Sequence, residues 1–287
     1  MPEPLTMREA VADWEIHLRA EGKSPKTVEI YTSAARRLPR VEASAREVRA
    51  VLAGLMDRSP AYASLHYRAW QQWFRWLRSE RLITTNPLES IRPPRVPVKP
   101  VPVLSDADLR RLLAACSGSE FTARRDAALI RLFVDTGCRA SEILGLQPEA
   151  LDLRTMSVLV LGKGRRPRIV PFGSKTAEAL RRYLQARRSH RWSHLPDLWL
   201  SRYGRLTHSG LAQMLERRSV KAGLARVYPH QLRHSAAHRW LANGGGETDL
   251  MRLMGWSSRE MLARYAASAA DERARQAHRH AALGDRL

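Results

Sequence analysis

The sequence is poor in cysteine and in acidic residues, and each shortage excludes a class of protein. Its two cysteines, Cys116 and Cys138, are too few for the disulfide framework of a small secreted domain, so the composition suits a reducing cytosol. Only 28 acidic residues stand against 49 lysines and arginines, which gives a formal net charge of +21. Such an excess of positive charge predicts a polyanionic partner.

Long apolar runs are also absent. The apolar stretch 127–134 is interrupted by Arg131, and the first residues show no basic start followed by an apolar segment. We therefore expect neither a membrane span nor a signal peptide. No long basic amphipathic helix with an aromatic opposite face is evident, which favours nucleic acid over an anionic lipid surface as the partner.

A proline-rich segment divides the chain. Residues 92–102 hold five prolines in eleven positions, a composition that forbids a helix and favours an extended linker. This boundary predicts one domain over residues 1–91 and another over residues 103–287. The first domain is expected to be a compact all-α module, because it carries four helix-start signals: Thr6 with Glu9, Ser24 with Pro25, Ser44 with Glu47, and Ser59 with Pro60.

The second domain is expected to combine helices with a small β element. Residues 121–136 predict a buried helix that ends at Gly137. The glycine-rich basic segment 162–166 lies between two β-rich runs, 156–161 and 167–172, which fits a hairpin or two neighbouring strands. The expected fold class is therefore mainly α with a small β-sheet or hairpin.

Two residues near the start of a predicted helix suit a phosphate. His230 and Arg233 follow Pro229 and are three positions apart, so they share a helix face. Arginine offers a planar fork of donors, and a helix start adds partial positive charge. The alternative is a solvated cationic face. The spacing of His230, His234 and His238 could also supply metal ligands, but no nearby Cys or Glu completes a zinc site, so we expect no metal.

Two further segments carry candidate residues. Arg139 follows the helix stop at Gly137, and Glu142 three residues on either orients it or forms an ordinary helical ion pair with it. Lys163 is one of only six lysines in an arginine-rich chain. Because lysine can release a proton where arginine cannot, Lys163 is a candidate acid, with a plain phosphate-binding role as the alternative.

A last segment contains Trp256 and Tyr265. A lone helical tyrosine usually packs in a core or an interface. Beside the other candidates, however, the Tyr265 phenolic oxygen could attack a phosphodiester while Arg139 and Arg233 neutralise the phosphorane.

Together these segments resemble the tyrosine recombinase, or phage integrase, family. Their order fits, and so do the intervals of 24 residues from Arg139 to Lys163, 26 from His230 to Trp256 and 9 from Trp256 to Tyr265. Trp256 stands where most members carry histidine; its indole N–H can donate a hydrogen bond but cannot shuttle a proton. The resemblance extends to residues 1–91, which look like the helical core-binding domain of compact members, including Xer-like and small phage or plasmid enzymes.

The resemblance implies a two-domain clamp on double-stranded DNA with specific core sites. Tyr265 would form a 3′-phosphotyrosyl link, Lys163 would protonate the leaving oxygen, His230 would bind the phosphate and accept the tyrosine proton, and Trp256 would pack or donate a hydrogen bond. No cofactor, metal or ATP is implied. The basic residues expected to contact DNA are Lys23, Lys26, Arg68, Arg75, Arg95, Arg165, Arg166 and Arg168.

The resemblance also implies partners and a setting. Strand exchange needs a homotetramer, and accessory DNA-bending or directionality factors are expected partners. The tail, 271–287, is a candidate for docking onto a neighbouring copy, with a frayed terminus as the alternative. The expected location is the cytoplasm of a bacterium or a phage-infected host, at the nucleoid. Two other functions remain open: a type IB topoisomerase-like relaxase and a non-catalytic DNA-binding regulator.

Overall fold

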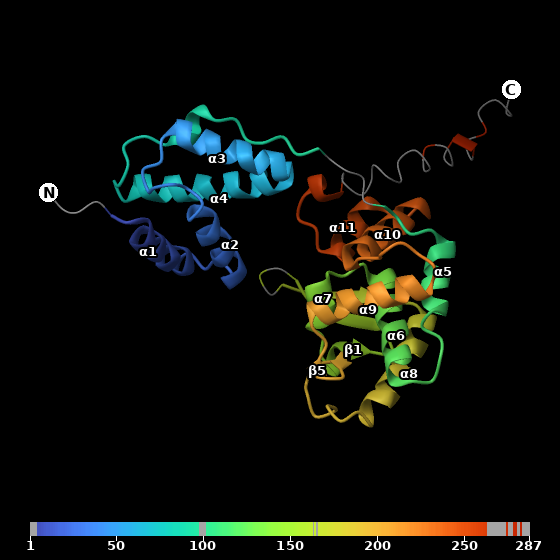
Figure 1. The fold of residues 1–287 in the computed structure, drawn as a ribbon. Helices are drawn as coiled ribbons and strands as arrows, with labels where there is room; N and C mark the ends of the chain where they lie inside the picture. The colour runs from blue at the N-terminus through green and yellow to red at the C-terminus, as the bar shows by residue number, and fades with distance from the viewer. Residues whose placement is uncertain are drawn as a thin grey trace. The chain divides into compact units, whose positions relative to one another are not determined.

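The computed structural model describes residues 5–97, 102–162, 164, 166–262, 274, 278, 279 and 282. The chain divides into two compact units, Met1–Lys99 and Pro100–Leu287. Each unit has its own hydrophobic core, and the helices and strands of each unit are drawn in Figure 1.

The first unit is built from helices that begin where the sequence signals them. The side chains of Thr6 and Ser44 accept hydrogen bonds from the third helical N–H, and the glutamates there bond back, so both capping boxes form. The core is aromatic, because Trp14, Trp70 and Trp73 are at most 1% exposed. The predicted four helices are confirmed as α1 Met7–Ala20, α2 Pro25–Ala35, α3 Ala45–Arg58 and α4 Pro60–Ser79, followed by the 3₁₀ turn η1 Pro87–Ser90.

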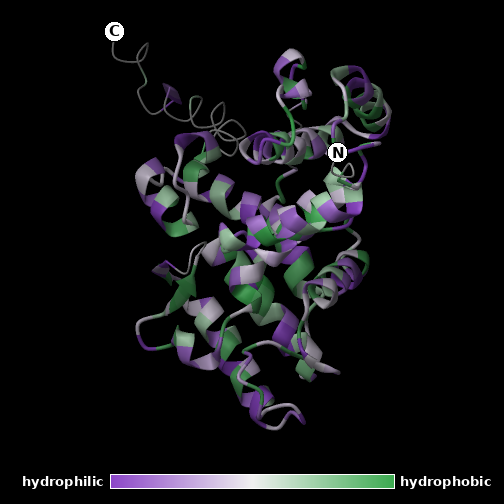
Figure 2. Ribbon diagram, turned by 90° about the vertical axis from the view of Figure 1, so that its left-hand side faces the viewer, coloured by the Kyte–Doolittle hydropathy of each residue, from purple (hydrophilic) through white to green (hydrophobic). Residues whose placement is uncertain are grey.

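The second unit is mostly helical, with other helices packed around one largely buried helix, α6. Helix α6 matches its predicted bounds, lies against α8 and α10, and ends at the left-handed Gly137. Figure 2 shows mostly hydrophobic segments inside this unit. None of the described helices is long and apolar enough to span a membrane. The helical elements are α5 Asp106–Ala114, α6 Phe121–Thr136, α7 Ala140–Leu144, η2 Pro148–Ala150, α8 Ser174–Arg188, α9 His208–Lys221, α10 Pro229–Ala242 and α11 Glu247–Met254.

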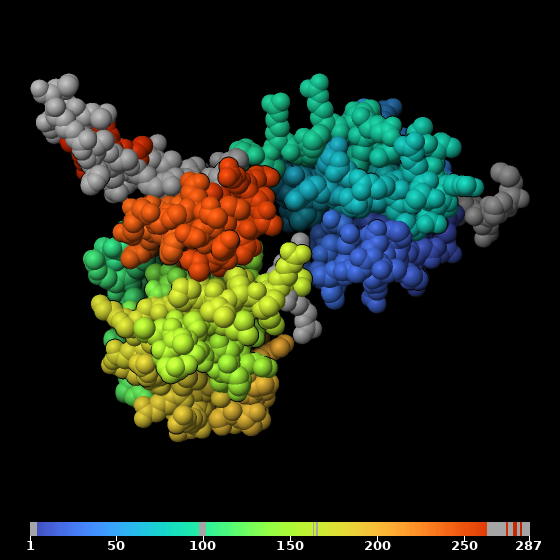
Figure 3. Space-filling view, turned by 180° about the vertical axis from the view of Figure 1, so that it is seen from behind, coloured from blue at the N-terminus to red at the C-terminus, as the bar shows by residue number. Residues whose placement is uncertain are grey.

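A three-stranded antiparallel sheet lies at the surface of this unit, and it contains the predicted hairpin. Val160 and Val170 face the core, whereas Ile169 points to solvent and is 69% exposed. The atoms of the hairpin accordingly reach the surface in Figure 3. The sheet order is β1 Leu151–Asp152, β2 Ser157–Leu161 and β3 Pro167–Pro171, and a second pair is formed by β4 Leu200–Ser201 and β5 Gly204–Arg205.

The fold class expected from the sequence, mainly α with a small sheet, is confirmed. Sequence reasoning missed β1 and the β4–β5 pair. Each of these strands has two residues, which is too short to show an alternating pattern.

Candidate active site

The turn between α6 and α7 brings Arg139 against the end of α11. Gly137 has a φ of 57°, a left-handed backbone that favours glycine. A Cβ at this position would also meet the flexible end of the Met254 side chain, which would have to move. Arg139 follows as the N-cap residue of α7, with its side chain one third exposed.

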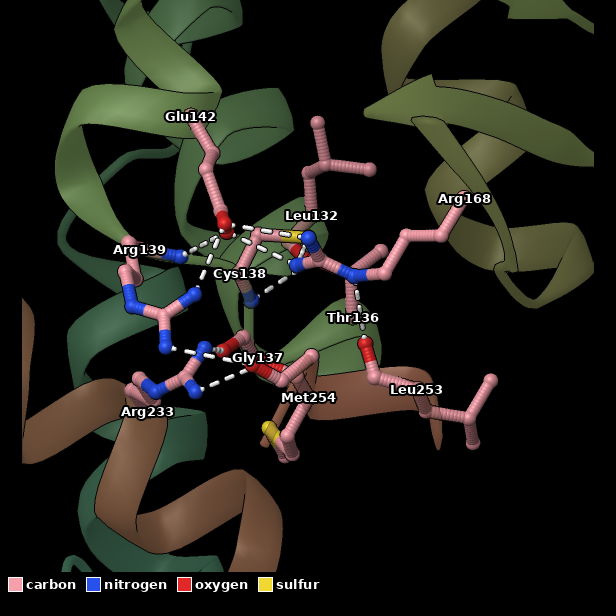
Figure 4. A network of polar contacts seen from close by, with 11 residues as sticks. Leu132, Thr136, Gly137, Cys138, Arg139, Glu142, Arg168, Arg233, Leu253 and Met254 are labelled. Carbon is pink, nitrogen blue, oxygen red and sulfur yellow. Dashed lines mark hydrogen bonds and ion pairs between the residues drawn. The ribbon is translucent and has the colours of Figure 1, made fainter. Parts of the chain in front are cut away.

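Glu142 is a buried carboxylate held by two arginines. Its side chain is 4% exposed, and its Oε1 atom accepts from Nη1 of Arg139 at 2.9 Å. Arg168 donates to both carboxylate oxygens, at 3.0 and 2.8 Å (Figure 4). Burial opposes ionisation of Glu142, but the hydrogen bonds from Arg168 and Arg139 outweigh it and hold its pKa below the usual value. The side chain is thus an anion that fixes two guanidinium groups.

Arg233 reaches the same place from α10. Arg233 is buried, with 3% of the residue exposed. Its guanidinium donates to the Gly137 carbonyl at 2.6 Å and to the Met254 carbonyl at 2.8 Å. The guanidinium carbon lies 5.5 Å from the centre of the Trp256 ring, which is itself buried. Nη2 of Arg139 donates to the Gly255 carbonyl at 3.3 Å. Arg139 and Arg233 are therefore bound to neighbouring carbonyls, although 94 positions separate them in the chain.

His230 and His234 form a hydrogen-bonded pair on α10. Their Nε2 atoms are 2.8 Å apart, and the two rings meet at 88°. Burial and then the charge of Arg233 lower the pKa of His230. Burial, followed by the charges of His230 and Arg233, lowers the pKa of His234 to about 4. The lowered pKa values favour the neutral form of both rings, in which one ring nitrogen donates and the other accepts.

Acidification is expected to destabilise the second unit through His234. Because the folded-state pKa lies below the ordinary value, the stabilising contribution is complete above about pH 6.5 and is lost as the pH falls towards 4. Between pH 7 and pH 4.5, the melting temperature of the wild type should fall about 5 °C further than that of His234→Gln. The exposed His194→Gln should keep the wild-type pH dependence; equal slopes for all three proteins would refute this linkage.

The position of Arg168 differs from the DNA-contacting position that the sequence predicts. The sequence places it among the DNA-contacting residues of the hairpin, but alternation along β3 turns its side chain inward, where it is 13% exposed and bound to Glu142. Its guanidinium donates to Glu142 and to the Leu253 carbonyl within the fold. The other described residues of the expected DNA-contacting set are exposed: Lys23, Lys26, Arg68, Arg75, Arg95 and Arg166.

Several predicted residues lie outside the described part of the chain. These are Lys163, Arg165 and Tyr265, together with most of the tail 271–287. Lys163 and Arg165 belong to the turn between β2 and β3, and Tyr265 follows Trp256 by nine positions. Across the described ranges, no three His, Cys, Asp or Glu side chains are grouped to hold a metal ion.

Sequence reasoning missed two contacts of the site. It considered His230 and His234 together only as possible metal ligands, although their four-residue spacing already placed both rings on one helix face. It also missed the Arg168–Glu142 pair, because Ile169 and Val170 are both apolar and the sequence does not show which of them shares a strand face with the core.

Both the sequence and the fold are similar to those of known proteins. Residues 102–272 match the model described as the phage integrase family. Tyrosine recombinase XerC of Actinobacillus pleuropneumoniae serotype 7 (strain AP76) is 34% identical over 196 residues, which cover 68% of this chain and 64% of that protein. The chain thus spans slightly less than two thirds of that relative.

Solved structures share the fold at lower identity. The Tn1549 transposon integrase in complex with transposon right end DNA has a TM-score of 0.76 at 18% identity, covering 97% of this chain and 100% of that one. A lambda integrase tetramer bound to a Holliday junction has a TM-score of 0.73 at 20% identity, covering 92% and 78% of the two chains.

Proposed function

This chain belongs to the phage integrase family of tyrosine recombinases, and from that premise we propose that it is a site-specific DNA recombinase. One observation carries the proposal within the structure. Arg139 and Arg233, from different helices, donate to the adjacent carbonyls of Gly255 and Met254, so one phosphate could meet both guanidiniums. Two positive groups at one point suit the charge of a phosphoryl transition state.

The proposed reaction conserves the phosphodiester bond energy in the protein. The Tyr265 oxygen attacks phosphorus while the bond from phosphorus to the 5′ oxygen breaks, which gives a 3′-phosphotyrosyl link. His230 accepts the phenolic proton, and Lys163 donates a proton to the leaving 5′ oxygen. The 5′-hydroxyl of a partner strand then attacks the phosphotyrosyl group and releases Tyr265. Because Arg139 and Arg233 supply the positive charge, the proposed steps use no metal and no ATP.

DNA binding is proposed for both units. The exposed basic residues of the first unit, namely Lys23, Lys26, Arg68, Arg75 and Arg95, would bind backbone phosphates, as would Arg165 and Arg166 of the hairpin. We propose that residues 1–91 form the core-binding domain, that 92–102 link it to the catalytic domain 103–287, and that the domains clamp one duplex. The lambda integrase tetramer on a Holliday junction supports a homotetramer acting on two duplexes. The setting that fits DNA as substrate is the bacterial cytoplasm.

A covalent-trapping experiment tests the function. A library of nicked duplexes with randomised cores should yield a protein–DNA adduct that survives denaturant, because the cleaved fragment diffuses away and cannot rejoin. Sequencing the trapped DNA should return a core motif. A DNA-binding regulator would bind the library without forming an adduct. A type IB topoisomerase-like enzyme would relax supercoiled DNA at single sites without needing a paired site, whereas a recombinase should exchange strands only between two matching sites.

A further inference from the structure

Every nitrogen of the Arg168 guanidinium donates to an acceptor within the fold. Nε donates to the Leu253 carbonyl at 2.9 Å, and Nη1 and Nη2 donate to the two oxygens of Glu142. Nη2 also lies 3.7 Å from the Cys138 sulfur. Four donor contacts of the guanidinium therefore go to partners within the fold, and the side chain is only 13% exposed, so Arg168 is poorly placed to bind a phosphate as well.

Three arginine side chains donate hydrogen bonds to successive backbone carbonyls at the end of α11. The carbonyls of residues 253–255 accept in turn from Arg168, Arg233 and Arg139. These arginines come from β3, α10 and the start of α7, and Figure 4 shows them converging on this helix end. The last carbonyls of a helix lack intrahelical partners and carry partial negative charge, which favours cationic donors. The helix end thus sets the relative positions of the three guanidiniums.

Gly255 provides the room for this arrangement. Its φ is 62°, and a Cβ here would lie 3.1 Å from Nη1 of Arg168. The left-handed backbone and the close guanidinium both favour glycine. Trp256 follows Gly255 directly in the sequence.

The charges explain why a second arginine is needed at Glu142. If Arg139 alone faced this buried carboxylate, the pair would be neutral, and Arg139 would offer little net charge to a phosphate. With Arg168 as a second partner, Glu142 can orient Arg139 while the three arginines and one carboxylate keep a formal charge of +2.

We propose that Arg168 is a positioning residue for strand cleavage, a role that rests on the recombinase function proposed above. It neutralises Glu142, so that the Arg139 charge remains available to the scissile phosphate. It also ties the base of the β2–β3 hairpin, through its register partner Val160, to the end of α11. Lys163, the proposed acid, lies five positions before Arg168 in the sequence.

The test compares matched substitutions on a nicked suicide substrate. Arg168→Gln should lower the single-turnover cleavage rate at saturating DNA by about 10- to 100-fold, while the half-saturating DNA concentration changes by less than about threefold. Arg168→Lys should fall between Arg168→Gln and the wild type, because it keeps the charge but not the fork. Arg182→Gln, which breaks an exposed ion pair with Glu178 on α8, should cleave at the wild-type rate.

A double variant separates charge balance from simple damage to the fold. In Glu142→Gln/Arg168→Gln the carboxylate and its partner are both removed, and the amide oxygen can still accept from Arg139. This protein should cleave at least about threefold faster than Arg168→Gln, because no unpaired carboxylate competes for Arg139. If Arg168→Gln fails to fold by circular dichroism, the comparison of the lysine and double variants with the wild type decides the matter.

Each contrary outcome has a distinct meaning. A wild-type rate for Arg168→Gln at saturating DNA would overturn the positioning role, and a loss confined to DNA affinity would make Arg168 a DNA contact instead. A double variant no faster than folded Arg168→Gln would overturn the charge argument. Absence of an adduct with the wild type itself would overturn the recombinase function, and the role of Arg168 in it.

Discussion

Replacing Tyr265 with phenylalanine is expected to abolish the covalent protein–DNA adduct. The substitution removes only the phenolic oxygen, which is the atom that would bond to phosphorus, so no 3′-phosphotyrosyl link can form. We expect adduct formation to fall by at least about 1,000-fold, to the limit of detection on a denaturing gel. DNA binding in a mobility-shift assay should change little, because the ring remains and one hydroxyl is lost.

A second tyrosine provides the control for this experiment. Tyr203 lies in the turn between β4 and β5 and is 82% exposed, so Tyr203→Phe makes the same chemical change at a surface position. This variant should form the adduct as the wild type does. An adduct that persisted in Tyr265→Phe, with a peptide map placing DNA on another residue, would refute the nucleophile assignment.

Helix starts and stops could be predicted from the sequence because they depend on hydrogen bonds and backbone preferences of neighbouring residues. Thr6 with Glu9 and Ser44 with Glu47 specify helix starts through their own hydrogen bonds, and these helices begin where expected. Gly137 stops α6 because a left-handed residue is needed there. Such features depend on a few consecutive residues, and therefore a single sequence suffices to place them.

The contacts that were missed depend on residues far apart in the chain. Glu142 is 26 positions from Arg168, and Leu253 is a further 85 positions away, so no local pattern joins them. In the structure Val170 is buried and Ile169 is exposed, so Arg168 points inward with Val170, but both neighbours are apolar and the sequence alone does not show this. The basic composition led to the prediction that every arginine of the hairpin contacts DNA, whereas the Arg168 side chain is 13% exposed and lies beside the Glu142 carboxylate.

Replacing Lys163 with alanine is expected to slow cleavage of an ordinary phosphodiester by about 100- to 10,000-fold, the range of a lost general acid. The 5′ oxygen leaves as an alkoxide unless it receives a proton, and an alkoxide is a poor leaving group. A substrate with sulfur in place of the bridging 5′ oxygen removes this need, because a thiol has a pKa near 8.5 and departs as the thiolate. Lys163→Ala should therefore recover most of its cleavage rate on the sulfur substrate.

Arg139→Ala supplies the contrast that makes the recovery interpretable. Its side chain donates to Glu142 and to the Gly255 carbonyl beside the contacts of Arg233, a position from which it would neutralise charge on the phosphorane rather than protonate the leaving group. Sulfur at the bridging position leaves that charge in place, so Arg139→Ala should stay slow on both substrates. Equal recovery of both variants would mean that sulfur merely speeds the bond-breaking step in general. No recovery of Lys163→Ala would mean that the lysine binds phosphate without donating a proton, since a purely electrostatic contact is needed as much for a thiolate as for an alkoxide.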